Sequence, residues 1–152
     1  MSVLRKILAR RHPALRRPFP GQDGEELSNH HLGEYGERLA ALALEAKGYK
    51  ILYRNFRGAR GGEVDIVCRH GKILVFTEVK TRTSLKYGRP SEAVTPAKQH
   101  LILRGAKEWL ARLHTDAIPV RMDVVEVLFT VGKPPDITVI EDAFGDEGSH
   151  IT

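Results

Sequence analysis

The sequence has little cysteine and no long apolar segment, and each shortage excludes a class of protein. Its 152 residues contain a single cysteine, Cys68, so no disulfide can form within the chain. Cys68 lies in an apolar strand pattern, which favours a small core residue over a nucleophile. No apolar run approaches the roughly 18 residues that a membrane-spanning helix needs. These features predict a cytoplasmic protein with no membrane segment.

Acidic residues are missing from the first 20 positions, where six arginine or lysine residues lie. The apolar pieces there are only two or three residues long, so we expect no secretory leader. Sustained periodicity is also missing, and residues 1–28 are predicted to be a mostly disordered basic tail with one short helix near 3–10. Residues 142–152 are predicted to be an acidic tail, which leaves 29–141 as one folded domain.

Basic residues exceed acidic ones, with 24 Lys and Arg against 19 Asp and Glu and a formal net charge of +5. A basic chain attracts anionic partners, nucleic acid first, because each cation near a phosphate releases condensed counterions. A basic surface that only faces solvent explains the same charge equally well.

The periodicity of apolar residues predicts an α/β fold with two helices. Residues 33–50 are rich in Ala and Leu, with Gly48 where a helix would end. Thr95 followed by Pro96 is a typical helix start, and this helix should extend to about Leu113. Strands are predicted at 49–56, 63–68, 72–80, 120–130 and 137–140. The order α-β-β-β-α-β-β predicts a mixed central sheet flanked by helices.

The predicted hairpin at 62–82, GEVDIVCRHGKILVFTEVKTR, contains an unusual number of charged residues. A turn centred on His70 and Gly71 would place Asp65 opposite Phe76 and Glu63 opposite Glu78. Because side chains alternate along a strand, Glu63, Asp65, Glu78 and Lys80 would share one face. The core face would consist of Val64, Ile66, Cys68, Ile73, Val75, Thr77 and Val79.

Two interpretations of this acidic face stay open. In the first interpretation, the charges face solvent and Lys80 forms a weak surface ion pair with one of the acids. Alternatively, a divalent cation neutralises the carboxylates, since Mg²⁺ prefers oxygen ligands and keeps several waters. Such a site would suit phosphodiester hydrolysis, with the lysine positioning the attacking water or stabilising charge on the phosphate.

Asp65 followed after twelve residues by Glu78-Val79-Lys80 resembles the D…ExK core of the PD-(D/E)XK nuclease superfamily. Six blocks in order are similar to the bacterial YraN family of endonuclease-like proteins: GEYGERLA, GYKILYRNFR, GEVDIV, VFTEVKTR, YGRPSEAVTPAKQ and RMDVVEV. The resemblance covers about residues 33–130. It implies a restriction-endonuclease-like αβββαβ core and a metal-dependent endonuclease acting on DNA.

The resemblance also implies roles for individual residues. Asp65 and Glu78 would bind Mg²⁺ or Mn²⁺, and Lys80 would be the catalytic lysine. Glu37 would be the acid that resolvase-like members carry on the first helix, pointing into the site. Glu63 would be a further ligand or a neighbouring acid.

Phosphate contacts are expected from Arg60, Arg82 and Lys98, with Gln99 where RecB-type members have a glutamine. Leu103 replaces the tyrosine of that signature, so the resolvase-like branch is favoured. DNA is expected rather than RNA, although no motif separates them. A homodimer formed through an edge strand stays open, as does a nucleic-acid-binding or adaptor protein of the same fold without catalysis.

Overall fold

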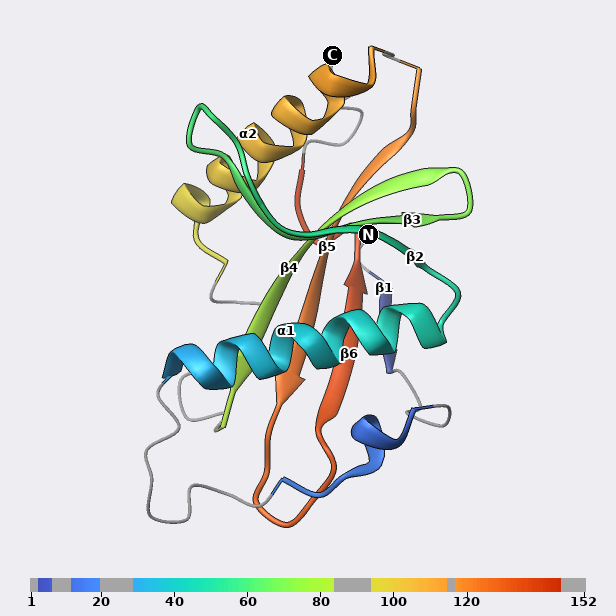
Figure 1. Ribbon diagram of the computed structural model, residues 1–152, viewed down its shortest axis with the longest axis vertical. Coiled ribbons are helices and arrows are strands. Elements are labelled where there is room, and N and C mark those ends of the chain that lie inside the picture. Colours follow the sequence, from blue (N-terminus) through green and yellow to red (C-terminus); the bar gives the residue numbers. More distant parts are fainter. Residues whose placement is uncertain (1–2, 7–11, 20–28, 84–93, 115–116, 146–152) are drawn as a thin grey trace.

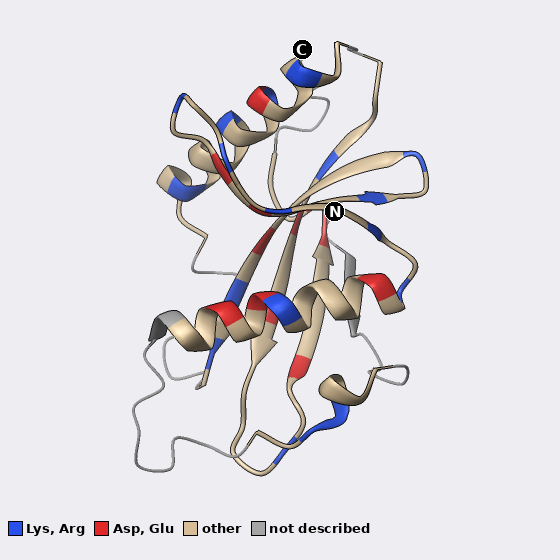
Figure 2. Cartoon of the chain, in the orientation of Figure 1, with Lys and Arg blue, Asp and Glu red and all other residues tan. Residues whose placement is uncertain are grey.

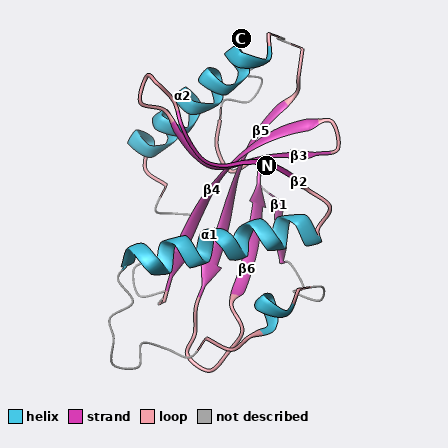
Figure 3. Ribbon diagram, in the orientation of Figure 1, coloured by secondary structure: helices cyan, strands magenta, loops and turns pink. Residues whose placement is uncertain are grey.

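The computed structural model describes residues 3–6, 12–19, 29–83, 94–114 and 117–145. A six-stranded sheet in the order β1-β6-β5-β4-β3-β2 forms its centre (Figures 1 and 3). The strands are β1 (Val3–Lys6), β2 (Lys50–Arg57), β3 (Glu63–His70), β4 (Ile73–Arg82), β5 (Val120–Leu128) and β6 (Asp136–Glu141). The helices are α1 (Asn29–Ala46), α2 (Pro96–Leu113) and the 3₁₀ helix η1 (Pro13–Arg16). β4 and β5 pair in parallel and the other neighbours are antiparallel, which confirms the predicted αβββαβ core and mixed sheet.

One helix packs on each face of the sheet, and apolar side chains fill both layers. α1 covers the face that carries Ile66, Cys68 and Val75, and we call this the α1-side core. α2 covers the face that carries Phe76, Leu74 and Val67, the α2-side core. No helix among the described residues is long and apolar enough to cross a membrane.

The hairpin register differs by two residues from the predicted one. Gly71 and Lys72 form the turn, so His70 pairs with Ile73 and Val67 with Phe76. The predicted pairings of Asp65 with Phe76 and of Glu63 with Glu78 were therefore wrong. The cause is Gly71, whose φ of 61° suits the first position of a tight two-residue turn. A shift of two residues leaves every side chain on its face, because the strand period is two.

Val64 departs from the alternation of β3. The sequence predicted it beside Ile66, but it packs in the α2-side core instead. Helix α2 comes close there through Gly105, where an added Cβ would lie 2.8 Å from Val64 Cγ2. The regular alternation of β3 is therefore interrupted around Asp65.

The described part of the N-terminal segment belongs to the fold, contrary to the predicted disordered tail. Residues 3–6 form strand β1 on β6, where a short helix was expected. Leu15 and Phe19 are buried in the α1-side core. Phe19 N donates to Lys133 O over 2.8 Å, which ties this segment to the β5–β6 connection. The predicted tail at 20–28 and most of the acidic C-terminal tail lie outside the described residues.

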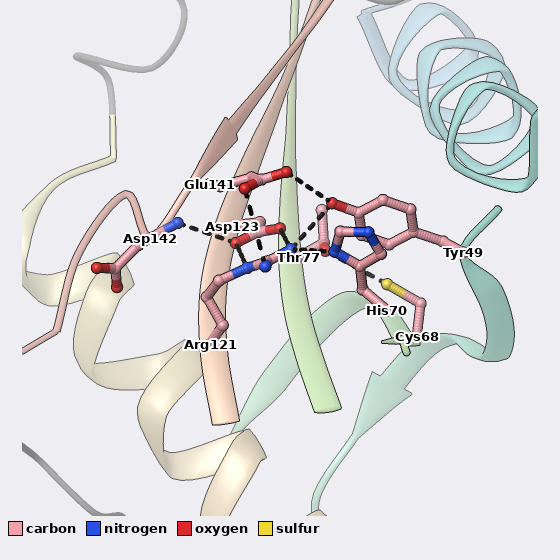
Figure 4. Close-up of polar contacts among 8 residues, drawn as sticks. All are labelled: Tyr49, Cys68, His70, Thr77, Arg121, Asp123, Glu141 and Asp142. Atoms are coloured by element: carbon pink, nitrogen blue, oxygen red, sulfur yellow. Dashed lines mark hydrogen bonds and ion pairs between the residues drawn. The ribbon is translucent and has the colours of Figure 1, made fainter. Parts of the chain in front are cut away.

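A buried polar network joins the start of β2 to β3, β5 and β6 (Figure 4). Arg121 forms ion-paired hydrogen bonds of 2.8 and 2.9 Å with Asp123, which is fully buried. Its Nη2 also lies 2.9 Å from Tyr49 Oη and 3.2 Å from His70 Nδ1. Tyr49 Oη in turn donates to Glu141 over 3.3 Å. Because each buried charge here has a partner of opposite charge, the network is explained by the architecture alone.

Candidate active site

Strands β3 and β4 separate at the position where the two acids of the D…ExK pattern lie. Their pairing extends from His70 and Ile73 at the turn to Ile66 and Thr77. Beyond that point β3 continues to pair with β2, and β4 with β5. The sheet therefore forks, and backbone groups of β4 face the fork without a strand partner.

Asp65 is the first residue of β3 beyond the last pair. Its Oδ2 accepts a hydrogen bond of 2.8 Å from the backbone N of Val79. A side chain thus takes the place of a backbone acceptor, which fixes the carboxylate in the fork. The bond satisfies a β4 amide that would otherwise lack a partner where the strands separate.

Glu78 is the first residue of β4 beyond the last pair, so it lies level with Asp65. Only 3% of Glu78 is exposed. Its Oε1 lies 3.5 Å from Lys80 Nζ and 3.7 Å from Lys98 Nζ. Its Oε2 is buried and has no hydrogen-bond partner among the described residues.

The environment of Glu78 opposes its negative charge. Burial, and then the neighbouring carboxylate of Asp65, raise the pKa of Glu78 to about 8, although Lys98 and Lys80 act in the opposite direction. Carboxylates that share a desolvated site favour a bound proton or a bound cation. The pair is therefore incompletely neutralised by the side chains around it.

A cleft of about 1020 Å³ opens in front of this pair, and we call it the main cleft. Its walls come from the N-terminal half of α1, from β2 and from the C-terminal half of β4. Figure 2 shows acidic and basic segments together where α1 passes over β4. The predicted site residues that line it are Glu37, Asp65, Glu78, Lys80 and Arg82.

Helix α1 brings Glu37 to the cleft through a close approach to β4. The preceding residue, Gly36, packs so tightly on Thr81 that a methyl group there would overlap Thr81 Oγ1. Burial, followed by the charge of Asp65, raises the pKa of Glu37 above its ordinary value, against the lowering effect of Arg54 and Arg57. Glu37 thus adds an acid beside the pair, and Glu34 of α1 is a fourth acid in the cleft lining.

Glu63 is held away from the other acids. It is not among the residues that line the main cleft, and it forms ion pairs with Arg57 and Lys98. Lys98 lies between Glu63 and Glu78, so α2 brings a second lysine to the acid pair.

Three predicted contact residues, Lys98, Gln99 and Arg60, also lie outside the cleft lining. Gln99 Nε2 donates to Val94 O over 3.1 Å, which fixes the side chain at the start of α2. Arg60 lies in the β2–β3 loop, where its backbone N donates to Glu108 of α2. The structure therefore separates Gln99 and Arg60 from the five predicted residues in the cleft.

The carboxylates of the cleft can hold a divalent cation only together with other ligands. Within the described ranges, no three His, Cys, Asp or Glu side chains are grouped closely enough to hold a metal ion. Asp65 and Glu78 nevertheless fit a Mg²⁺ or Mn²⁺ ion that takes its other ligands from water and phosphate. The observation that supports this fit is the buried Oε2 of Glu78, to which no N–H or O–H group of the described residues donates a hydrogen bond.

Several cleft residues were missed from the sequence. Arg54, Asn55 and Arg57 of β2 line the cleft, as does Arg38 of α1. Asn55 has a φ of 54°, a conformation that Asn tolerates better than most residues, so β2 is not a regular strand here. The sequence signal that could have identified these residues was the pair of arginines, Arg54 and Arg57, in a strand that otherwise alternates. Their position at the cleft follows only from the separation of β3 and β4.

The segment 36–127 matches the model of the uncharacterised protein family UPF0102. The chain belongs to the UPF0102 family. UPF0102 is the YraN family, so the resemblance found in the sequence is confirmed.

Bacterial UPF0102 proteins match most of this chain. One from Geobacter metallireducens is 51% identical over 118 residues, which are 78% of this chain and 95% of the relative. One from Caldicellulosiruptor saccharolyticus is 44% identical over 119 residues, 78% of this chain and 100% of the relative. One from Symbiobacterium thermophilum is 52% identical over 96 residues, 63% of this chain and 80% of the relative. The five predicted residues in the cleft, Glu37, Asp65, Glu78, Lys80 and Arg82, all lie in the matched UPF0102 segment.

Proposed function

We propose that this UPF0102 protein is a metal-dependent nuclease that hydrolyses phosphodiester bonds of DNA. The observation that carries the proposal is the incompletely neutralised pair Asp65 and Glu78 in the sheet fork, with Lys80 beside it. A fold alone does not assign a function, so the argument depends on the chemistry of this pair.

Different residues of the cleft would have different roles in hydrolysis. A divalent cation held by Asp65 and Glu78 would supply Lewis-acid stabilisation of charge on the phosphate. Lys80 would orient a water molecule for attack on phosphorus, as one P–O ester bond breaks and the leaving oxygen takes up a proton. The arginines of β2 and Arg82 of β4 would bind flanking phosphates.

A binding protein without catalysis is supported by one different observation. The ammonium groups of Lys80 and Lys98 both lie near Glu78 Oε1 and offset part of its charge without a metal. A protein that only binds DNA through the arginines would therefore tolerate the same acid pair.

Cleavage assays with conservative variants test the nuclease proposal. Purified protein would be incubated with labelled linear and branched DNA and with Mg²⁺ or Mn²⁺. Asp65→Asn, Glu78→Gln and Lys80→Met should each lower the cleavage rate by roughly 100-fold or more, since each removes a charge from the reacting centre. Lys107→Met and Glu45→Gln, which change exposed residues of α2 and α1, should cleave normally.

Calorimetric titration separates the two functions. Mg²⁺ or Mn²⁺ should bind the wild type, with a DNA oligonucleotide present, and not the Asp65→Asn, Glu78→Gln double variant. If the protein binds DNA but neither binds metal nor cleaves DNA, the nuclease proposal is rejected in favour of the DNA-binding function.

A further inference from the structure

A second cavity of about 390 Å³ opens beside the main cleft, and we call it the side cavity. The two cavities share the lining residues His31, Leu32, Tyr35 and Arg38 of α1. The opposite wall of the side cavity comes from the N-terminal segment, including Arg17 and Phe19. Because the two cavities are adjacent, a polymer bound in the main cleft can extend directly into the side cavity.

The side cavity differs from the main cleft in charge. The main cleft contains Glu37, Asp65 and Glu78, whereas no carboxylate lies among the described residues that line the side cavity. Arg17 and Arg38 are both exposed at its edge. The main cleft therefore combines an acid pair that suits a cation with basic side chains that suit phosphates, whereas the side cavity suits an anion alone.

Aromatic and apolar groups form the floor of the side cavity. The Phe19 and Tyr35 rings both pack on Phe129, with centroid separations of 4.8 and 5.4 Å. The Arg38 guanidinium lies 5.5 Å from the centre of the Tyr35 ring. Aromatic rings beside cationic side chains are the combination that binds unpaired nucleotides, with the base on the apolar surface and the phosphate on the cations. The volume is within the range of small-ligand sites.

We propose that the side cavity binds one unpaired nucleotide of the DNA strand that enters the main cleft. The inference rests on the proposed function and specifies its substrate class: DNA with an unpaired nucleotide next to the reacting phosphate. The base lies against Ala14 and the half-buried Tyr35, and Arg17 and Arg38 bind its phosphate. Continuous duplex is disfavoured because a paired base must leave its stack to reach the cavity.

Binding without metal tests the side cavity separately from catalysis. Fluorescence anisotropy in EDTA would compare a labelled single-stranded oligonucleotide with the same oligonucleotide annealed to its full-length complement as a blunt-ended duplex. Arg17→Ala should weaken single-strand binding roughly tenfold, the size of one lost charge-assisted contact, and duplex binding less than twofold. Ala14→Phe, which places a ring in the side cavity, should act in the same direction.

The matched control is Arg69→Ala, which removes an exposed arginine at the turn end of β3. It should leave the ratio of the two affinities unchanged, and thermal unfolding would show that all three variants fold. If Arg17→Ala and Ala14→Phe keep the wild-type ratio, the inference is overturned. If the ratio falls as expected but the wild type cleaves no DNA with any metal, the nuclease fails and the side cavity stands.

Discussion

At the scale of single residues, Glu78 is the residue whose negative charge is disfavoured by its position in the fold. The side chain is almost fully buried, its neighbour Asp65 carries the same charge, and two lysines offset this only in part. A carboxyl group in this position binds its proton more tightly in the folded protein than in the unfolded chain. Without bound metal, ionisation of Glu78 at high pH should therefore lower the free energy of unfolding by a measurable amount.

Stability without metal should decrease with pH because of Glu78. Its pKa rises from an ordinary value of 4.5 to about 8 on folding. The folded state thus gains most below the unfolded pKa and loses this gain as the pH rises through 8. Between pH 5 and 8.5, the free energy of unfolding of the wild type should fall by roughly 1–3 kcal/mol more than that of Glu78→Gln. Urea unfolding in EDTA measures this difference.

Glu45→Gln is the matched control for this experiment, because Glu45 is an exposed acid of α1. Its stability should follow the wild type across the same pH range. Parallel pH profiles for wild type and Glu78→Gln would mean that Glu78 is not perturbed by its surroundings.

At the scale of elements, the position of α1 on β4 decides where Glu37 lies. Gly36 allows the helix backbone to contact Thr81 directly, since no other residue lacks a Cβ. The same helix carries Gly33, where an added Cβ would meet nothing within 4 Å. The chain therefore contains a matched pair of glycines, one in contact with the sheet and one facing open space.

Gly36→Ala should destabilise the protein by roughly 1–3 kcal/mol, because the added methyl overlaps Thr81 and pushes α1 away from β4. Gly33→Ala should be neutral or stabilising by up to about 1 kcal/mol, since alanine favours the helix. Chemical unfolding compares the two variants. Equal effects of the two substitutions would show that the close contact does not set the position of α1.

Two side chains of α2, Glu108 and Arg104, attach the β2–β3 loop, and Arg104 Nη1 donates to Arg60 O over 3.4 Å. Glu108 accepts hydrogen bonds from the backbone N of Arg60 at 2.6 Å and of Gly62 at 3.2 Å. Glu108→Ala removes both acceptors, so these two amides should exchange hydrogen roughly tenfold faster. Amides of β4 should keep their protection, and Glu45→Ala should change neither set. Hydrogen exchange detected by NMR would reject the attachment if Arg60 and Gly62 kept wild-type rates in Glu108→Ala.

At the scale of the whole molecule, the fold extends beyond the segment that matches the family. That match covers 36–127, whereas Leu15 is fully buried in the α1-side core. The N-terminal segment also forms one wall of the side cavity through Arg17 and Phe19. Residues outside the matched segment therefore contribute to both stability and the proposed DNA contact.

Leu15→Ala should lower the free energy of unfolding by about 2–4 kcal/mol, as expected for a leucine deleted from a packed core. Leu52→Ala is the matched control, because Leu52 of β2 is 40% exposed and should lose less than about 1 kcal/mol. Urea unfolding of both variants measures the difference. A small effect of Leu15→Ala would mean that the N-terminal segment does not pack stably on α1.

The prediction of the elements from sequence was accurate because the relevant signals are local. Apolar periodicity and the Thr95-Pro96 start placed both long helices and the strands after Gly48 within a few residues of their observed ends. The shared face of Glu78 and Lys80 did not depend on the register, since a shift of two residues preserves every face. Local pattern therefore sufficed to place Glu78 and Lys80 on one face, whereas the position of Asp65 level with Glu78 depended on the observed register.

What the sequence by itself determined was the order of elements, the family resemblance and the residues of the D…ExK pattern. The tertiary structure alone decided the fork between β3 and β4, the arginines that face it, and the packing of Leu15 and Phe19 against α1. These features depend on pairing and packing between segments far apart in the chain, for which local periodicity carries no signal. Propensity and spacing indicate whether a segment prefers helix or strand. Only the assembled sheet determines which other residues that segment contacts.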